Sequence, residues 1–219
     1  MTDQLSQEWF ADRRGKVTAS RVADVIARTK TGWGASRANY AAQLVAERLT
    51  GETAESYTNA AMQWGTDTEP HARAAYEFRT DATVTETGFI PHPNIGMSGA
   101  SPDGFVGDGG QVEIKCPNTA THIETLLGQG VPAKYVTQMQ WQMACTGRAW
   151  CDFISFDPRM PESMRLFVKR VPRDNAAIAT LEADIIEFLG EIDRTVSALR
   201  SRYDAPEAKT AELSTLNGG

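Results

Sequence analysis

Ser101-Pro102-Asp103-Gly104 and Val112-Glu113-Ile114-Lys115-Cys116 are the two segments that decide the fold, and a glycine-rich turn joins them. A turn between short β-type runs is typical of a hairpin. Side chains alternate across a strand, so Glu113 and Lys115 point to the same face of the second strand. Asp103 lies one strand back and can meet Glu113 across the hairpin. The two segments therefore predict a hairpin that gathers two carboxylates and one amine.

This set of groups suits the hydrolysis of a phosphodiester bond. The reaction needs a nucleophilic water and neutralisation of the charge that builds up on the phosphate, and Mg²⁺ supplies both. Mg²⁺ prefers carboxylate oxygens and keeps exchangeable waters. We therefore expect Asp103, Glu113 and the backbone carbonyl of Ile114 to bind the metal. Lys115 stays protonated beside two carboxylates, so we expect it to position the attacking water or to neutralise the phosphate.

Each segment also has a simpler interpretation. Ser-Pro-Asp-Gly is an ordinary turn sequence, and Glu-x-Lys is a common charge pair on strands. Residues 103–110, rich in aspartate and glycine, could form a plain loop or a weak Ca²⁺ site. Short motifs of this kind often occur by chance. The ordered combination, an aspartate followed about ten residues later by Glu-x-Lys on a strand, is a more specific signal.

The composition fits one globular α/β domain. The chain has 219 residues, of which 41% are hydrophobic, and no apolar run approaches the ~20 residues of a membrane span. A secretory signal pattern is absent, and the three cysteines form no Cys-x-x-Cys pair. We therefore expect a cytoplasmic protein without disulfides or structural zinc. With only three histidines, a metal with oxygen ligands is favoured.

Charge is distributed unevenly along the chain. The formal net charge of −6 alone argues against a nucleic-acid partner. Residues 13–37 nevertheless hold seven basic side chains and one acid, whereas acids collect in the last predicted helix and the tail. This asymmetry suits an enzyme that grips a polyanion on one face, although a solvated basic surface would look the same.

Hydrophobic periodicity and turn residues predict helices, a run of strands, a helix pair, more strands and a closing helix. The helices are expected at about 5–12, 18–26, 36–50, 57–78 with an interruption near Gly65, 120–127, 132–145 and 176–202, and the strands at about 83–90, 95–100, 111–115, 150–156 and 165–171. Gly51 should end the third helix, and Asp174 should cap the last one. The order favours an α/β (α+β) fold in which helices flank a mixed central β-sheet. We expect a single domain over residues 1–203 and a disordered tail over 204–219.

Asp103…Glu113-Ile114-Lys115 resembles the Asp…Glu-x-Lys signature of the restriction-endonuclease-like nucleases. Further motifs follow in the same order as in bacteriophage lambda exonuclease and its YqaJ-type viral recombinase relatives: Trp9…Arg13-x-Gly15…Thr18-Ala19-Ser20, Trp64-Gly65…Glu69…Ala72-Arg73, Ser101-Pro102-Asp103-Gly104, Glu113-x-Lys115-Cys116-Pro117, Gln138-x-Gln140 and Asp157-Pro158-Arg159-Met160. The resemblance spans roughly residues 8–200 and implies a restriction-endonuclease-like core.

This resemblance implies an Mg²⁺-dependent, processive 5′→3′ exonuclease on linear double-stranded DNA. Such an enzyme leaves 3′ single-stranded overhangs for phage-type recombination by single-strand annealing. The resemblance also implies a two-metal site in which Mn²⁺ can substitute for Mg²⁺. The implied partners are DNA ends with a 5′-phosphate, two further copies in a ring-shaped homotrimer, and a single-strand annealing protein. A phage or prophage gene expressed in a bacterial host cell is implied as well.

Within the hairpin, the resemblance assigns a role to each polar group. Asp103 and Glu113 match the metal-binding acids, and the carbonyl of Ile114 matches a backbone ligand. Lys115 matches the catalytic lysine.

Two further active-site residues come from predicted helices. Glu69 matches a helical acid near the metals, although a lone glutamate on a helix is usually a solvated surface residue. Gln138 matches a glutamine that reaches the active site, although beside Trp141 it could be an ordinary polar surface position. Pro70 directly follows Glu69 and is expected in an early helical turn, where proline is tolerated.

Arg13, Ser20 and Ser101 match a pocket for the terminal 5′-phosphate. Arginine offers a planar fork of donors to phosphate, and hydroxyls or a helix N-terminus near Ser20 add further donors. Ser20 could also serve as a helix cap. Such a pocket would explain both a preference for 5′-phosphorylated ends and forward motion after each cut.

Three residues are expected to contact DNA elsewhere. Met62 matches an apolar residue that parts the two strands at the end, although a methionine taken alone suggests the core. Arg28 and Lys30 are expected to follow the duplex backbone through charge alone.

Two other functions stay open at this point. A structure-specific or site-specific endonuclease on the same fold would cut closed circular DNA, whereas an end-dependent enzyme would not. A non-catalytic DNA-end-binding protein would carry an inactive core, and the intact set of Asp103, Glu113 and Lys115 argues against it.

Overall fold

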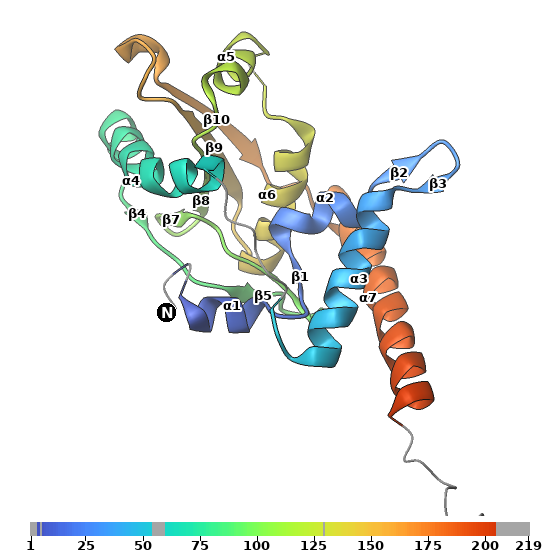
Figure 1. Ribbon diagram of the computed structural model, residues 1–219. Coiled ribbons are helices and arrows are strands. Elements are labelled where there is room, and N and C mark those ends of the chain that lie inside the picture. Colours follow the sequence, from blue (N-terminus) through green and yellow to red (C-terminus); the bar gives the residue numbers. More distant parts are fainter. Residues whose placement is uncertain (1–3, 5, 54–59, 129, 205–219) are drawn as a thin grey trace, which may run out of the picture.

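The computed structural model of the chain describes residue 4 and residues 6–53, 60–128 and 130–204. Its central sheet has five strands in the spatial order β10 (Leu166–Pro172), β9 (Trp150–Phe156), β8 (Gly110–Lys115), β7 (Gly104–Val106) and β4 (Val84–Thr85) (Figure 1). β8 pairs in parallel with β9 and antiparallel with β7, so the sheet is mixed, as predicted. A smaller sheet has the order β1 (Val17–Thr18), β6 (Ser98–Ala100) and β5 (Ile90–Pro91), and a hairpin joins β2 (Arg28–Thr29) to β3 (Gly32–Trp33).

Helices cover both faces of the central sheet (Figure 1). The α-helices are α1 (Gln7–Arg13), α2 (Val22–Val25), α3 (Ala35–Thr50), α4 (Ala60–Thr80), α5 (Thr119–Gly128), α6 (Ala133–Thr146) and α7 (Asn175–Tyr203), and the 3₁₀ turns are η1 (Ala19–Arg21) and η2 (Glu162–Met164). α5 and α6 form the crossover that a parallel β8–β9 pair requires.

Strand β8 is the centre of the fold because both of its faces are covered. Val112 and Ile114 face α4 and pack with Tyr76 in one apolar cluster. On the other face, Gln111 and Glu113 turn toward α6 and are fully buried. A strand buried on both faces is normally apolar throughout. The buried polar face of β8 is therefore the exception that marks a functional site.

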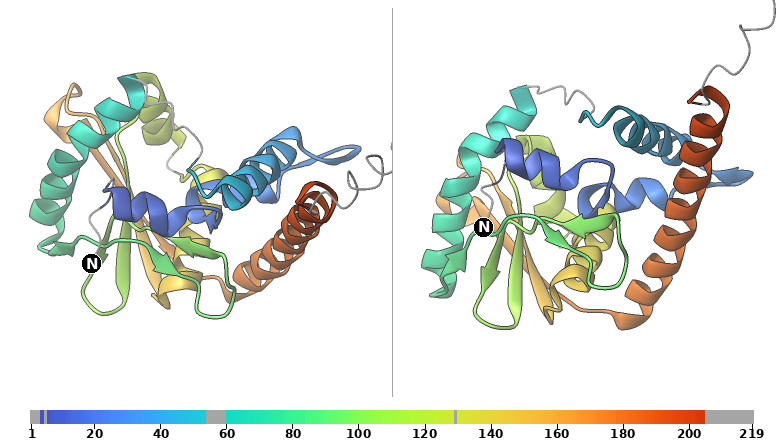
Figure 2. Two further views of the ribbon diagram at one scale, coloured as in Figure 1. Left: turned by 60° about the horizontal axis from the view of Figure 1, so that its bottom comes forward. Right: turned by 90° about the horizontal axis from the view of Figure 1, so that it is seen from below.

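The larger apolar core lies between α6, α7 and the elements near the N-terminus. Trp141 of α6, Tyr40 of α3 and Phe188 of α7 are among its fully buried side chains. Tyr40 and Phe188 stack with ring centroids 5.8 Å apart. α3 lies beside α7, and α7 extends away from the sheet (Figure 2). This core fixes the N-terminal segment, and with it Arg13 and Ser20, relative to the sheet.

The predicted helix ends at Gly51 and Asp174 are confirmed. Gly51 ends α3 with φ 71°, the left-handed conformation that glycine adopts at low cost. The Asp174 carboxylate accepts hydrogen bonds from the backbone N–H groups of Ala176 and Ala177, each at 3.0 Å, and so caps α7.

Several predicted boundaries are wrong. α4 runs without interruption through Gly65, and Pro70 lies inside this helix rather than in its first turns. The segment 83–90, predicted as one strand, contributes β4 to the central sheet and β5 to the smaller one. No strand was predicted between the helices at 18–26 and 36–50, yet this segment holds the β2–β3 hairpin. The predicted helix start at 57 lies outside the described residues, and so does the predicted tail over 204–219 apart from Asp204, the C-cap residue of α7.

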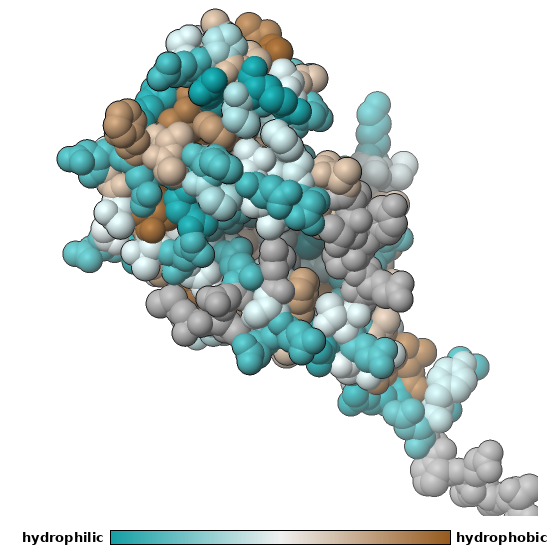
Figure 3. All heavy atoms as spheres, turned by 60° about the vertical axis from the view of Figure 1, so that its left-hand side comes forward, coloured by the Kyte–Doolittle hydropathy of each residue, from teal (hydrophilic) through white to brown (hydrophobic). Residues whose placement is uncertain are grey.

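The face on which α4 lies is mixed in polarity. Figure 3 shows apolar residues in separate small groups among hydrophilic ones on this side of the molecule. The most exposed large apolar side chain in the described part of the chain is Phe78 of α4, at 93%. Within the described residues, no helix combines the length and the apolarity that crossing a membrane requires.

Candidate active site

Asp103 and Ile114 meet where β7 begins. Oδ2 of Asp103 accepts a hydrogen bond from the backbone N–H of Ile114 at 2.6 Å. The pairing between β7 and β8 starts at Gly104, so the last residues of β8 extend beyond β7. There the Asp103 carboxylate, instead of a backbone carbonyl of β7, accepts the hydrogen bond from β8. In a strand, the N–H and C=O of one residue point to the same side. The carbonyl of Ile114 therefore faces the Asp103 side, as a metal ligand must.

Glu113 is the most enclosed group of the site, with no exposed surface. Its Oε1 accepts a hydrogen bond from Nε2 of Gln138 at 2.7 Å and forms an ion pair with the ammonium of Lys115. Its Oε2 accepts a hydrogen bond from Nε2 of Gln142 at 2.5 Å. The side chain of Lys115 keeps 29% of its surface exposed, so its ammonium lies between the buried Glu113 carboxylate and the solvent.

The carboxylates and the amine perturb one another strongly. Burial and then the nearby charge of Glu113 raise the pKa of Asp103 well above its ordinary value, against the opposing effect of Lys115. Burial lowers the pKa of Lys115, but the charges of Glu113 and Asp103 outweigh it and raise that pKa above its ordinary value. Lys115 is therefore an ammonium at neutral pH, which fits positioning and charge neutralisation. A bound cation would relieve the repulsion between the two carboxylates.

Glu69 reaches the edge of this site from α4. It is half-buried, and its carboxylate accepts a hydrogen bond from Arg73 at 3.2 Å, one helical turn away. Burial raises the pKa of Glu69, Arg73 and Lys115 lower it, and Glu113 raises it further. Arg73 also pairs with Glu86, so it fixes the direction of Glu69 despite the adjacent proline. The structure thus brings Glu69 into the electrostatic range of the metal-site groups.

A cavity of about 820 Å³ near the N-terminus gathers residues of the predicted phosphate pocket. Arg13, Ser20 and Met62 line this N-terminal cavity, together with the basic side chains Arg14, Lys16 and Arg21. Met62 is 49% exposed, so the alternative that placed it in the core is wrong. The cavity carries four basic groups against Glu47, the one acid that lines it among the described residues.

Ser101 connects this cavity to the hairpin. Its hydroxyl oxygen lies 3.1 Å from Nη1 of Arg13 and 3.0 Å from Nε1 of Trp9, and both nitrogens donate to it. The Arg13 guanidinium stacks on the Trp9 ring, 4.0 Å from the ring centroid. Burial lowers the pKa of Arg13 to about 10, while Tyr40 and Glu47 raise it, so the side chain remains charged at neutral pH.

Ser20 does not cap a helix. It lies inside the 3₁₀ turn η1, whose N-cap residue Thr18 makes no side-chain cap hydrogen bond. The hydroxyls of Thr18 and Ser20 are 3.5 Å apart. The Ser20 hydroxyl is therefore placed to serve the cavity and not the helix start.

Arg28 and Lys30 are not part of either group. They lie in the β2–β3 hairpin, which projects beside α3, apart from the central sheet (Figure 1). The side chain of Arg28 is 64% exposed, lies 4.0 Å from Asp184 and stacks over Trp33 at 3.7 Å from the ring centroid. Their role as DNA-backbone contacts stays a prediction.

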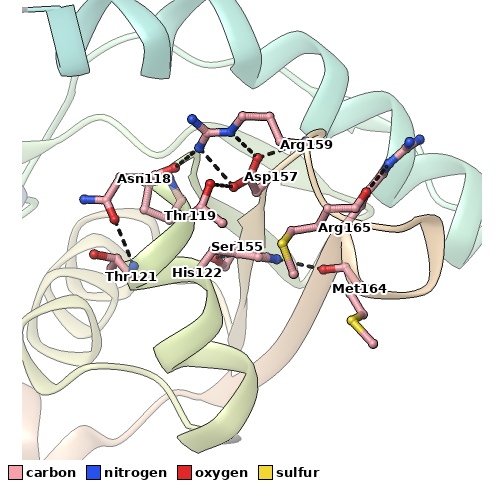
Figure 4. A network of polar contacts seen from close by, with 11 residues as sticks. Asn118, Thr119, Thr121, His122, Ser155, Asp157, Arg159, Met164 and Arg165 are labelled. Atoms are coloured by element: carbon pink, nitrogen blue, oxygen red, sulfur yellow. Dashed lines mark hydrogen bonds and ion pairs between the residues drawn. The ribbon is translucent and has the colours of Figure 1, made fainter.

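A polar network anchors the loop that leaves Lys115 (Figure 4). Asp157, at the end of β9, accepts hydrogen bonds from Thr119 at 2.7 Å and from Nε of Arg159 at 2.7 Å. The Arg159 guanidinium also lies over the ring of Trp64 on α4, 4.5 Å from its centroid. Burial opposes ionisation of Asp157, but the hydrogen bonds from Arg159 and Thr119 hold its pKa at about 2. The network thus ties β9, the loop after β8 and α4 together.

The same view shows a serine beside a histidine. His122 lies between the Ser155 hydroxyl, 2.8 Å from Nδ1, and the Met164 carbonyl, 2.8 Å from Nε2 (Figure 4). A carbonyl only accepts, so Nε2 carries the proton and Ser155 donates to Nδ1. His122 and Ser155 are both buried, so the pair is structural and no serine nucleophile is present here.

Sequence reasoning missed Gln142. Helix α6 contains glutamines at 138, 140 and 142, and helical spacing places the first and third on one side of it. Gln140 points elsewhere and bonds the carbonyl of Pro172 at 2.9 Å. The i, i+4 spacing of Gln138 and Gln142 was the signal that could have identified the second donor to Glu113.

The donor set fits a hard divalent cation. Two carboxylates and one carbonyl give only oxygen ligands, and Mg²⁺ is commonly held by one or two carboxylates while it keeps several waters. Within the described ranges, no group of three or more His, Cys, Asp and Glu side chains converges on one point. The residues present therefore fit Mg²⁺ better than zinc.

A mixed sheet that carries an aspartate and a Glu-x-Lys pair at the ends of adjacent central strands defines a nuclease-type core. The model of the YqaJ-like viral recombinase domain matches residues 8–149, and the chain belongs to this family. An alkaline exonuclease, LHK-Exo, from Laribacter hongkongensis is 54% identical, with a TM-score of 0.84 over 90% of this chain and 97% of that one. Its complex with dAMP has a TM-score of 0.85 over the same shares of the two chains.

A more distant structure shares the fold. A phage-related exonuclease from Haemophilus somnus is 16% identical, with a TM-score of 0.69 over 84% of this chain and 96% of that one. No curated protein matches the chain significantly. The likeness to the alkaline exonuclease supports the nuclease activity predicted from the hairpin, and the predicted fold class is confirmed.

Proposed function

We propose that the chain is an Mg²⁺-dependent, processive exonuclease that digests the 5′-ended strand of linear double-stranded DNA. The product would be a 3′ single-stranded overhang for recombination by single-strand annealing. The observation that carries this proposal is the short connection between two sites. Ser101 bonds Arg13 in the N-terminal cavity, and Asp103, two residues later, bonds Ile114 at the metal site.

This connection limits the distance between a bound end and the reacting bond. Two residues of extended chain span at most about 7 Å. A terminal phosphate held by Arg13 and Ser101 would therefore lie close to the metal site, a separation comparable with that of neighbouring phosphates along a DNA strand. An enzyme built in this way measures its cut from the 5′-phosphate, which favours an exonuclease over an endonuclease.

Each residue then has a chemical task. Mg²⁺, when bound, would supply Lewis acidity and an activated water. Asp103, Glu113 and the carbonyl of Ile114 would hold it. Lys115 would orient the water and neutralise the phosphate charge, as its ammonium state allows.

Residues outside the hairpin would complete the site. Glu69 and Gln138 would line it from α4 and α6, and Gln138 would also keep the carboxylate of Glu113 in place. Met62, exposed on α4 in the N-terminal cavity, would part the two strands at the end. Arg28 and Lys30 would contact the duplex backbone.

The relatives favour the same substrate class. LHK-Exo is an exonuclease and is known in complex with dAMP, a mononucleotide of the kind that an exonuclease releases. We extend the proposal to two metal ions with Mn²⁺ as a substitute, a homotrimeric ring around DNA, a single-strand annealing partner and action in the cytoplasm of a bacterial host. Sedimentation with and without duplex DNA would test the trimer.

Digestion of linear and closed circular duplex DNA, with and without Mg²⁺, tests the proposed activity. We expect loss of the linear form only, and only with Mg²⁺ or Mn²⁺. Cutting of the closed circle would favour a structure-specific endonuclease. Binding of ends without any cleavage would favour a non-catalytic end-binding protein.

A further inference from the structure

We infer that Gln142 is a positioning residue: from the buried side, it fixes the orientation of the Glu113 carboxylate that we propose binds the metal. Gln142 is the last donor in a buried series of hydrogen bonds that ends at Glu113. The inference rests on the proposed metal-dependent function. Gln142 follows Gln138 by one turn of α6, so the two amides reach Glu113 from the same side. Gln138 is half-buried at the site, whereas Gln142 has no exposed surface. Gln142 therefore acts through Glu113 and not by touching DNA.

The hydrogen bonds behind Glu113 all run in one direction. Oε1 of Gln142 accepts from Nε2 of Gln111 at 3.3 Å, and Oε1 of Gln111 accepts from the Thr146 hydroxyl at 2.8 Å. The Thr146 oxygen in turn accepts from the backbone N–H of Arg148 at 3.3 Å. Because each group donates toward Glu113, the chain presents its final N–H to an anionic acceptor. Hydrogen bonds aligned in this way polarise one another in a low-dielectric interior.

The two oxygens of Glu113 are used differently. Oε1 meets two donors, Gln138 and the ammonium of Lys115. Within the described part of the chain, Oε2 receives one hydrogen bond, from Gln142. A carboxylate oxygen has two lone-pair sites. The lone pair that remains free to bind a cation therefore lies on Oε2, and the hydrogen bond from Gln142 fixes the direction of that lone pair.

A purely structural role would not need this arrangement. Gln111, Gln142 and Glu113 are all fully buried, and buried polar groups stabilise a fold no better than well-packed apolar ones. Gln140 on the same helix shows what a structural glutamine does. Its amide bonds the Pro172 carbonyl and the Asp174 N–H, each at 2.9 Å, and so joins α6 to the start of α7.

This contrast provides a matched control. Mn²⁺ is titrated calorimetrically into the full chain without DNA, for the wild type, Gln142→Met and Gln140→Met. Groups that orient a metal ligand typically contribute about 10–100-fold to metal affinity. We expect Gln142→Met to weaken Mn²⁺ binding by about that factor and to raise the Mg²⁺ concentration for half-maximal digestion, with the rate restored at saturating Mg²⁺. Gln140→Met should lower Tm and leave the Mn²⁺ affinity unchanged.

Variants at residues farther from Glu113 along this series of hydrogen bonds should give progressively smaller effects on Mn²⁺ affinity. Gln111→Met and Thr146→Val should weaken Mn²⁺ binding progressively less than Gln142→Met, since each acts one bond farther away. If Gln142→Met does not fold, the Mn²⁺ affinity of Thr146→Val, a change at a half-buried residue, is compared with that of Gln140→Met instead. Wild-type Mn²⁺ affinity in the folded Gln142 and Thr146 variants, or an equal loss in Gln140→Met, would overturn the inference. A wild type that digests DNA without metal would instead remove the proposed function itself.

Discussion

Arg13 and Ser101 lie 88 positions apart in the sequence, yet Nη1 of Arg13 donates a hydrogen bond to the Ser101 hydroxyl at 3.1 Å. This contact brings the basic N-terminal segment to the hairpin that carries Asp103 and Glu113, the acids that we propose bind the metal. It explains how a chain with a formal net charge of −6 can offer a polyanion a basic surface beside its active site.

Arg13→Ala should slow digestion of 5′-phosphorylated ends and leave 5′-hydroxyl ends nearly unaffected. A hydrogen bond to a charged group is worth about 1.5–3 kcal/mol, which corresponds to a loss of roughly ten- to a hundredfold. The measurement is the initial rate on duplexes that differ only in the 5′ group. Arg194→Ala, at an exposed position on α7, is the control. Equal slowing on both ends would remove the phosphate-pocket assignment.

Lys115→Ala should abolish cleavage while DNA binding persists. The variant loses the ammonium that pairs with Glu113 and that we propose neutralises the reacting phosphate, and groups of this kind contribute about 10²–10⁴-fold to the rate. Single-turnover digestion gives the rate, and fluorescence anisotropy gives the affinity for duplex DNA. Lys169→Ala, exposed on β10, should digest at the wild-type rate. Normal digestion by Lys115→Ala would contradict the proposed mechanism.

The double variant Arg28→Ala/Lys30→Ala should weaken duplex binding and make it less sensitive to salt. Each phosphate contact releases about one counterion, so the slope of log K against log salt concentration should fall by about two. Binding is measured between low and physiological salt, with Ca²⁺ in place of Mg²⁺ to prevent cleavage. The preference for phosphorylated ends should not change. An unaltered slope would show that the β2–β3 hairpin does not contact the DNA backbone.

Asp157→Asn should lower the free energy of unfolding at pH 7 by about 1–2 kcal/mol. The folded-state pKa of Asp157 is lowered to about 2, below its value in the unfolded chain. The ionised carboxylate therefore stabilises the fold at pH values above the unfolded pKa, and this stabilisation is lost as the pH falls toward 2. The difference between the wild type and the variant should therefore shrink between about pH 4 and pH 2. Urea unfolding at several pH values checks this, with the exposed Glu124→Gln as the control. A difference that does not depend on pH would show that the ion pair with Arg159 is not its source.

The sequence predicted those parts of the site that follow from local rules. Strand alternation places Glu113 beside Lys115 and turns Ile114 into the core, as observed. The structure brings Gln138 to Glu113 and Arg13 to Ser101, residues that the resemblance had grouped, whereas the roles assigned to them stay predictions. Both contacts join distant segments, so residue spacing alone could not have supplied them.

The errors have physical causes. Pro70 was predicted in an early helical turn because proline lacks an N–H, yet the packing of Ala72 and Tyr76 against the sheet keeps α4 helical on both sides of it. The segment 83–90 reads as one strand, and only the tertiary structure divides it between two sheets. Gln142 was missed because its i, i+4 spacing from Gln138 shows that the two share one side of the helix, but not that this side is buried against Glu113.

A strand-resolved digestion assay tests the central claim most directly. A linear duplex carries a 5′-phosphate on one strand only and a different label on each 3′ end, and both strands are followed with and without Mg²⁺. We predict that the phosphorylated strand shortens from its 5′ end, only with Mg²⁺, while the other strand stays intact over the same period. Loss of the 3′ labels before the 5′ nucleotides would contradict the proposed 5′→3′ exonuclease. Equal digestion of both strands from their 5′ ends would contradict the preference for a 5′-phosphate.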